Sequence, residues 1–176
     1  MATSSTLTLD FQTIAVIGAG AMGRGIAQIA AQTGATVYLY DTNHAACLDA
    51  KKQLCAQWDK LVAKAKISSE NASAYLGNIR VAETMDDLGG CELIVEAIIE
   101  RLDIKQDLFK SLEAVVTDQC VLASNTSSLS ITAIAAGLER PERFAGYHFF
   151  NPVPLMRVVE VIAGLKTEPD VIHRLQ

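Results

Sequence analysis

The sequence predicts an α/β fold, with a doubly wound, mostly parallel sheet and an antiparallel pair of strands at the C-terminal end. Three observations support this prediction. Short apolar runs alternate with longer helix-forming segments, a pattern typical of a parallel sheet covered on both faces. The first apolar run ends in a glycine-rich turn that opens a helix. Near the C-terminus, two strands are joined by a connection too short for a crossover helix.

The first elements form a strand–helix–strand unit. Residues 13–17 are mostly β-branched and apolar and predict a strand buried on both faces. Helix-forming residues follow over 21–33, and Gly34 ends them where a left-handed residue is favoured. Residues 36–40 form the second strand, which ends at Asp41. A strand, a glycine turn, a helix and a second strand in about 30 residues make a βαβ unit.

The middle of the chain continues the alternation. Residues 44–65 carry apolar side chains at helical spacing, with Lys and Asp on the other face, and predict an amphipathic surface helix; these are Leu48, Leu54, Trp58, Leu61 and Val62. A short helix over residues 69–76 ends at Gly77. The next elements are a strand at 79–82, a strand at 91–97, a helix at 102–116 and a strand at 120–123.

The last third predicts a hairpin. Residues 144–149 and 157–162 are strand-like, and only Asn151-Pro152-Val153-Pro154-Leu155-Met156 separates them. Parallel strands need a crossover of about a dozen residues or more, so these two should pair antiparallel. Residues 167–170 then begin a helix, with Thr167 as a candidate N-cap and Pro169 in the first turn.

Composition and charge exclude several classes of function. The chain has 176 residues, 50% hydrophobic and 20% charged, with a net charge of −5, which is typical of a soluble domain. Lys and Arg do not cluster, so neither nucleic acid nor an anionic membrane is an expected partner. No apolar run reaches the ~18 residues of a membrane span. Residues 1–12 are Ser- and Thr-rich, lack Lys and Arg, and predict a mobile tail rather than a targeting signal, so we expect a cytoplasmic protein.

The four cysteines have no C-x-x-C spacing, and no His lies at a metal-ligand offset from them. We therefore expect buried, structural thiols in a reducing compartment and no metal site.

The segment Gly18-Ala19-Gly20-Ala21-Met22-Gly23 matches the dinucleotide motif G-x-G-x-x-G, between a predicted strand and a predicted helix. Gly18 permits the tight turn, Gly20 lets the backbone approach a pyrophosphate, and Gly23 lets the helix pack close to the strand. Free N–H groups at the helix N-terminus favour phosphate binding. The sequence thus predicts a Rossmann domain; the alternative is a glycine-rich turn that binds nothing.

Asp41 ends the second predicted strand, where a carboxylate can accept hydrogen bonds from the adenosine ribose. The 2′-phosphate of NADP would meet this carboxylate, and the following Thr42, Asn43 and His44 include no Arg or Lys to compensate. We therefore predict NAD as the cofactor. A solvated aspartate at a strand end is the alternative.

Three polar clusters follow predicted strands, at the edge where doubly wound sheets bind their ligands. They are Glu96 to Glu100 with Lys105, Ser124 to Ser128, and His148 with Asn151. If the last turn centres on Pro154, His148 and Glu160 become cross-strand neighbours within hydrogen-bonding reach. A neutral imidazole can then accept a hydroxyl proton while hydride leaves, with the carboxylate fixing the tautomer. His148 considered alone could instead be a structural histidine.

Four motifs now occur in order: Gly18-Ala19-Gly20-Ala21-Met22-Gly23-Arg24-Gly25, Glu96-Ala97-Ile98-Ile99-Glu100, Ser124-Asn125-Thr126-Ser127-Ser128-Leu129 and His148-Phe149-Phe150-Asn151-Pro152-Val153-Pro154. Together they resemble the N-terminal NAD-binding domain of the L-3-hydroxyacyl-CoA dehydrogenase family, which includes 3-hydroxybutyryl-CoA dehydrogenases. The likeness covers residues 13 to about 170. It implies an oxidoreductase that reversibly oxidises (3S)-3-hydroxyacyl-CoA to 3-ketoacyl-CoA with NAD, as in β-oxidation and other fatty acid metabolism.

The resemblance also implies residue roles. His148 is the implied general base and Glu160 its carboxylate partner. Ser127 and Asn151 would hold the 3-oxygen and thioester region of the substrate, although Ser127 could instead be a hydroxyl that opens the next helix. For the cofactor, the resemblance implies Glu100 and Lys105 near the nicotinamide ribose and Met22 and Asp41 at the adenine half, in addition to Gly18, Gly20 and Gly23. Lys105 as a solvated helix charge is the alternative.

Two departures from the family accompany this likeness. Arg101 follows Glu100 where members usually have Asn, which could change a cofactor contact or reach an acidic acyl tail. The family also has a C-terminal helical domain that supplies homodimer contacts, covers the acyl chain and adds an active-site Asn. We therefore expect a tail at 1–12, the Rossmann domain at 13–166, and at 167–176 a helix leading to that absent domain.

This domain organisation predicts that the chain binds NAD but turns over poorly without the helical domain. Two alternatives stay open. One is an NAD-linked 3-hydroxyacid dehydrogenase of another type, which would use a catalytic Lys; the other is a catalytically silent NAD-binding or structural relative.

Overall fold

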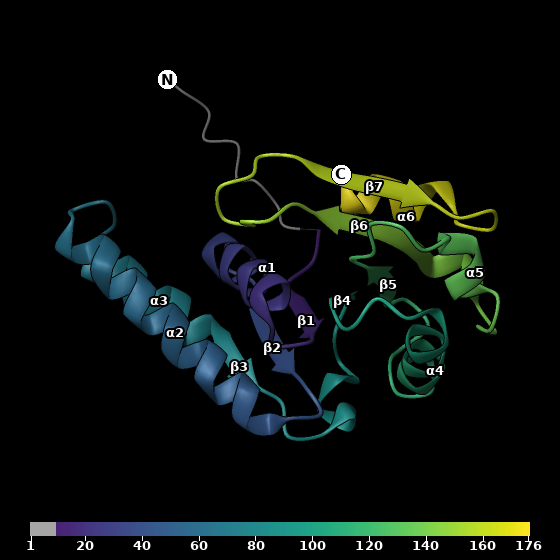
Figure 1. Ribbon diagram of the computed structural model, residues 1–176, viewed down its shortest axis with the longest axis horizontal. Helices are drawn as coiled ribbons and strands as arrows, with labels where there is room; N and C mark the ends of the chain where they lie inside the picture. The colour runs from purple at the N-terminus through teal and green to yellow at the C-terminus, as the bar shows by residue number, and fades with distance from the viewer. Residues whose placement is uncertain (1–9) are drawn as a thin grey trace.

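A seven-stranded sheet organises the chain, with the strand order β3-β2-β1-β4-β5-β6-β7 (Figure 1). The computed structural model describes residues 10–176. The strands are β1 (Thr13–Ile17), β2 (Thr36–Tyr40), β3 (Ile79–Val81), β4 (Leu93–Glu96), β5 (Val121–Ser124), β6 (Phe144–Phe149) and β7 (Val159–Ala163). The helices are α1 (Ala21–Thr33), α2 (His44–Ala63), α3 (Ser69–Asn78), α4 (Leu102–Glu113), α5 (Ile131–Ala135) and α6 (Pro169–Leu175).

The predicted fold class is confirmed. The first six strands of the chain pair in parallel, and β7 pairs antiparallel with β6. The order reverses between β1 and β4, the point where doubly wound sheets open a crevice for their ligands. This crevice lies at the carboxyl ends of the parallel strands.

Each face of the sheet has its own apolar core. On one face α1, α2, α3 and α6 cover the strands, with Leu54 and Trp58 of α2 fully buried. On the other face α4 and α5 do so, and Phe109 of α4 meets Phe144 of β6 edge to face at 4.7 Å. Full burial of each such side chain stabilises the fold by about 1.5–3 kcal/mol. Leu48, counted with the apolar face of α2, is 53% exposed.

Several predicted boundaries differ from the structure because turns intervene. The strand expected from residue 91 begins at Leu93, since the N–H of Cys91 bonds to the carbonyl of Leu88 in a turn. The helix expected to reach residue 116 ends at Glu113. The last strand spans Val159–Ala163, two residues later than its predicted start.

The predicted tail at residues 1–12 lies largely outside the described residues. Its described end is part of the domain. Phe11 is buried, and the guanidinium of Arg174 in α6 stacks 4.8 Å from its ring centre. The carbonyl of Gln12 accepts a hydrogen bond from the N–H of Thr36. Within residues 10–176, no helix is both long and apolar enough to cross a membrane.

Candidate active site

The glycine loop between β1 and α1 has the geometry that dinucleotide binding requires. Gly18 has φ +102°, and a Cβ there would lie 2.6 Å from the carbonyl oxygen of Ala97. A Cβ on Gly23 would lie 1.8 Å from the carbonyl oxygen of Gly18, so only glycine lets α1 pack this close. By contrast, nothing lies within 4 Å of a Cβ built on Gly20. That open space is where a pyrophosphate can approach the backbone.

A cavity of about 450 Å³ adjoins this loop, and Gly18, Gly20, Asp41, Met85, Ile98 and Leu108 contribute to its wall. One carboxylate oxygen of Asp41 accepts the N–H of Ala19 at 2.8 Å, and the other accepts the N–H of Asn43 at 2.9 Å. Asp41 therefore fixes the glycine loop against the end of β2, and each oxygen can still accept a further hydrogen bond. Apolar walls with one carboxylate suit an adenosine whose ribose hydroxyls donate to Asp41.

His148 and Glu160 form the predicted cross-strand pair. They are directly opposite in the β6–β7 register, and Nδ1 of His148 lies 2.8 Å from Oε2 of Glu160. A carboxylate oxygen can only accept here, so Nδ1 is the donor of this hydrogen bond and Nε2 is left for a ligand. The side chain of His148 is 16% exposed, and the ring of Phe150 lies 4.6 Å from its own.

A second cavity, of about 340 Å³, brings the predicted catalytic and substrate residues together. Its wall includes Met22, Glu100, Asn125, Ser127, His148 and Asn151. Ala97 and Ile98 line both cavities, so the two adjoin along the crevice of the sheet. Met22, expected at the adenine half, instead lines this second cavity.

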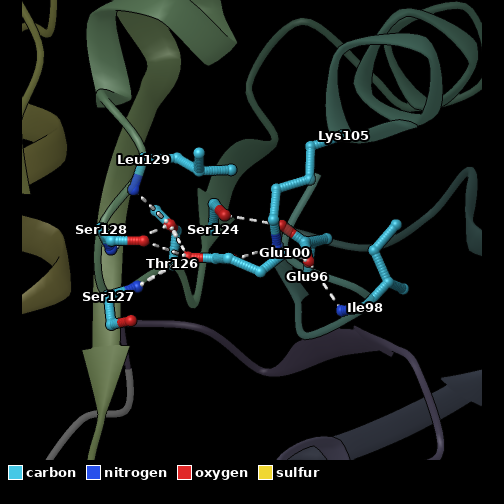
Figure 2. Close-up of polar contacts among 9 residues, drawn as sticks. All are labelled: Glu96, Ile98, Glu100, Lys105, Ser124, Thr126, Ser127, Ser128 and Leu129. Carbon is cyan, nitrogen blue, oxygen red and sulfur yellow. Dashed lines mark hydrogen bonds and ion pairs between the residues drawn. The ribbon is translucent and has the colours of Figure 1, made fainter. Parts of the chain in front are cut away.

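An ionic network reaches the second cavity through Glu100, and its contacts are drawn in Figure 2. Lys105 in the first turn of α4 has a side chain only 1% exposed, so its interpretation as a solvated helix charge is wrong. Its Nζ lies 2.5 Å from Oε1 of Glu96 and 3.3 Å from Oε2 of Glu100. Glu96 is fully buried and also accepts the hydroxyl of Ser124 and the N–H of Ile98, at 2.6 and 2.7 Å.

Glu100 connects this network to the loop after β5. Its Oε1 accepts the hydroxyl of Thr126 at 2.5 Å, the hydroxyl of Ser128 at 3.2 Å and the N–H of Ser127 at 3.3 Å (Figure 2). Partial burial raises the pKa of Glu100, but the hydrogen bond from Thr126 and the charge of Lys105 outweigh it, so the pKa lies below its usual range. Glu100 is therefore ionised at neutral pH.

Ser127 does not open the following helix, so that alternative is wrong. Helix α5 starts at Ile131, and its N-cap is Ser130, whose hydroxyl accepts the N–H of Ala133. Ser127 is exposed and lies in the loop held by Glu100.

Asn125 is a site residue to which the sequence reasoning assigned no role. Its side-chain oxygen accepts the N–H of Phe149 at 2.8 Å, and its own N–H donates to the carbonyl of Glu96 at 2.7 Å. Asn125 thereby fixes the end of β6, next to His148, to the ends of β4 and β5. Its position in the sequence, directly after a buried strand, could have identified it, because side chains at that position lie at the ligand-binding edge of the sheet.

Arg101 is exposed and forms an ion pair with Asp103 in the first turn of α4. It lines neither of the two cavities. Exposed pairs of this kind contribute little to stability, so Asp103 would not hold the guanidinium strongly in place.

Comparison with known proteins agrees with this geometry. Residues 13–176 match the family model described as the 3-hydroxyacyl-CoA dehydrogenase NAD binding domain. A curated relative named 3-hydroxyadipyl-CoA dehydrogenase, from Escherichia coli, is 42% identical over 96% of this chain and 36% of its own length. A probable 3-hydroxybutyryl-CoA dehydrogenase from Deinococcus radiodurans is 45% identical over 88% of this chain and 55% of its own.

Solved structures give the same result. The crystal structure of a 3-hydroxybutyryl-CoA dehydrogenase from E. coli K12 matches with a TM-score of 0.92 and 43% identity, over 94% of this chain and 35% of that one. This chain thus spans about a third to just over half the length of these relatives. The match over residues 13–176 shows that the chain belongs to the 3-hydroxyacyl-CoA dehydrogenase family and corresponds to its NAD-binding domain.

Proposed function

We propose that this chain is the cofactor-binding part of an NAD-dependent dehydrogenase that reversibly oxidises a (3S)-3-hydroxyacyl-CoA to the 3-ketoacyl-CoA. The observation that carries the proposal is the His148–Glu160 hydrogen bond of 2.8 Å beside a cavity that adjoins the glycine loop. A base held by a carboxylate, next to a dinucleotide crevice, is the arrangement that alcohol oxidation requires.

In this proposal, Nε2 of His148 accepts the proton of the substrate 3-hydroxyl. Glu160 keeps Nδ1 protonated and stabilises the imidazolium that forms. The bound NAD would accept the hydride that leaves C3, so the substrate loses one proton to His148 and one hydride to the cofactor. In the reverse direction, the imidazolium returns the proton to the ketone oxygen.

The remaining residues hold the two reactants. Ser127 and Asn151, which share the second cavity with His148, would hold the 3-oxygen and the thioester region. Gly18, Gly20 and Gly23 form the pyrophosphate cradle, with Asp41 on the adenosine ribose. Glu100 and Met22 would border the nicotinamide half. Lys105 would act there from its buried position behind Glu100 rather than from a solvated one.

The partner proposed for the whole protein is an acyl-CoA thioester, in a cytoplasmic homodimer completed by a C-terminal helical domain. The curated relatives carry the names 3-hydroxyadipyl-CoA and 3-hydroxybutyryl-CoA dehydrogenase, which supports this class of substrate. β-Oxidation or a related fatty acid pathway is the corresponding proposed context.

The test measures NADH oxidation with acetoacetyl-CoA in the full-length protein that includes the helical domain, as the wild type and as His148→Gln. Loss of the general base should lower the rate by about 100-fold or more at neutral pH, while NADH affinity changes little. Glu168→Gln, which removes an exposed carboxylate at the N-cap of α6, is the control and should retain the wild-type rate. A His148→Gln protein with a near-wild-type rate would refute the assignment.

A further inference from the structure

The ionic network that reaches the second cavity has an unequal charge balance. It contains two carboxylates, Glu96 and Glu100, and one ammonium, Lys105. Lys105 contacts both carboxylates, so the formal charges of the cluster sum to −1. Because a charge without a partner is costly inside a protein, the position of the excess charge matters.

The geometry places the excess charge on Glu100. Lys105 lies 2.5 Å from Glu96 and 3.3 Å from Glu100, and both Lys105 and Glu96 are almost completely buried. Glu100 is 38% exposed, lines the cavity that contains His148, and is held mainly by the neutral donors Thr126, Ser127 and Ser128. The ion pair of Arg101, the next residue, is with Asp103 rather than with Glu100.

The two redox forms of the cofactor differ in charge only at the nicotinamide ring, which is a cationic pyridinium when oxidised and neutral when reduced. A fixed carboxylate facing the nicotinamide half therefore favours the oxidised form. The adenosine and pyrophosphate contacts are common to both forms, so they cancel in the ratio of the two dissociation constants.

We propose that the Glu96–Lys105–Glu100 cluster sets the preference of this domain between oxidised and reduced NAD, with Glu100 supplying the charge and Glu96 acting as a positioning residue. Glu96 engages Lys105 in the interior, which leaves Glu100 only partly neutralised at the cavity. The inference rests on the proposed function, because it requires the nicotinamide to occupy the cavity beside His148.

The experiment measures the dissociation constants of NAD⁺ and NADH for the 176-residue chain by calorimetry. Glu100→Gln keeps an acceptor for Thr126 and removes the charge, and it should raise the ratio Kd(NAD⁺)/Kd(NADH) by about 3- to 30-fold, the range for one charge in a partly exposed site. Glu96→Gln should raise the ratio in the same direction, because Lys105 then pairs fully with Glu100. Asp107→Asn, which removes an exposed carboxylate from the helix that carries Lys105, should change the ratio by less than about twofold.

The Glu96→Gln result separates this inference from a purely structural role, which would weaken both redox forms equally. The Glu100→Gln measurement is decisive even if Glu96→Gln does not fold, because Glu100 is partly exposed. If both forms bind and their ratio is unchanged in Glu100→Gln, this inference is wrong and the proposed function stands. If the wild-type chain binds neither form, the proposed function fails and the inference fails with it.

Discussion

Alanine substitutions in the glycine loop should separate binding from folding. In Gly20→Ala, nothing lies within 4 Å of the new methyl, so the domain should fold almost normally. Gly20 is the N-cap of α1 in extended conformation, and alanine there should cost less than about 1 kcal/mol. The methyl would occupy the space through which a pyrophosphate approaches, so NADH affinity should fall by at least about tenfold.

Gly23→Ala is the contrasting variant. Its methyl would lie 1.8 Å from the carbonyl oxygen of Gly18, a backbone atom that cannot rotate away. Helix α1 would have to move off β1, and overpacking of this kind costs about 1–3 kcal/mol or more. For a domain of this size, about 3 kcal/mol corresponds to a Tm decrease of roughly 6–12 °C.

Thermal unfolding and NADH fluorescence titration measure these two effects separately. Gly20→Ala should melt within about 3 °C of the wild type and bind poorly, whereas Gly23→Ala should melt much lower. Wild-type NADH affinity in Gly20→Ala would refute the pyrophosphate assignment. A wild-type Tm in Gly23→Ala would contradict the packing of α1 against the loop.

Three further predictions follow from single residues. Asp41→Asn keeps one of the two backbone hydrogen bonds that the carboxylate accepts, because the amide nitrogen can only donate. It should reduce the preference for NAD over NADP by about tenfold in paired titrations, because a charged acceptor for the ribose is lost. An unchanged preference would remove Asp41 from the ribose site. Burial raises the pKa of Cys91 and of Cys120 to about 12, so a thiol reagent at pH 8 should label half-buried Cys55 first. A fast phase of labelling that persists in Cys55→Ser would contradict this prediction. Because the pKa of Glu100 is lowered in the folded protein, its ionised carboxylate stabilises the fold at pH values above the ordinary pKa of 4.5, and this stabilisation is lost as the pH falls through the folded-state pKa. The difference in urea midpoint between wild type and Glu100→Gln should therefore shrink from pH 7 to pH 3. A constant difference would show that the charge of Glu100 does not contribute to stability.

Features that depend on neighbouring residues in the chain were predictable. Gly34 ends α1 with φ +101°, as expected for a left-handed residue after a helix. The pairing of His148 with Glu160 was also predictable, because a short connection between two strands restricts them to a hairpin and its centre at Pro154 fixes the register.

Features that depend on contacts between residues distant in the chain were not predictable from the sequence. Lys105 occupies the first turn of an amphipathic helix, where lysine is normally solvated, and its burial depends on carboxylates from the end of β4 and the following loop. The role of Asn125 requires β5 and β6 to be neighbours with Ser124 opposite Gly146, a register that no local pattern contains.

The antiparallel β7 explains how consecutive strands can bring the proposed base and its carboxylate to one edge of the sheet. A parallel strand after β6 would begin at the opposite edge, so a carboxylate near its start would lie a full strand length from His148. The hairpin returns the chain at once, and Glu160, the second residue of β7, lies opposite His148. Asn125 adds the other constraint, because it binds the N–H of Phe149 and so fixes β6 to the parallel strands that carry the glycine loop and Glu100. The parallel strands therefore build the dinucleotide crevice, and the single reversal of direction places His148 and Glu160, the proposed proton-accepting pair, beside it.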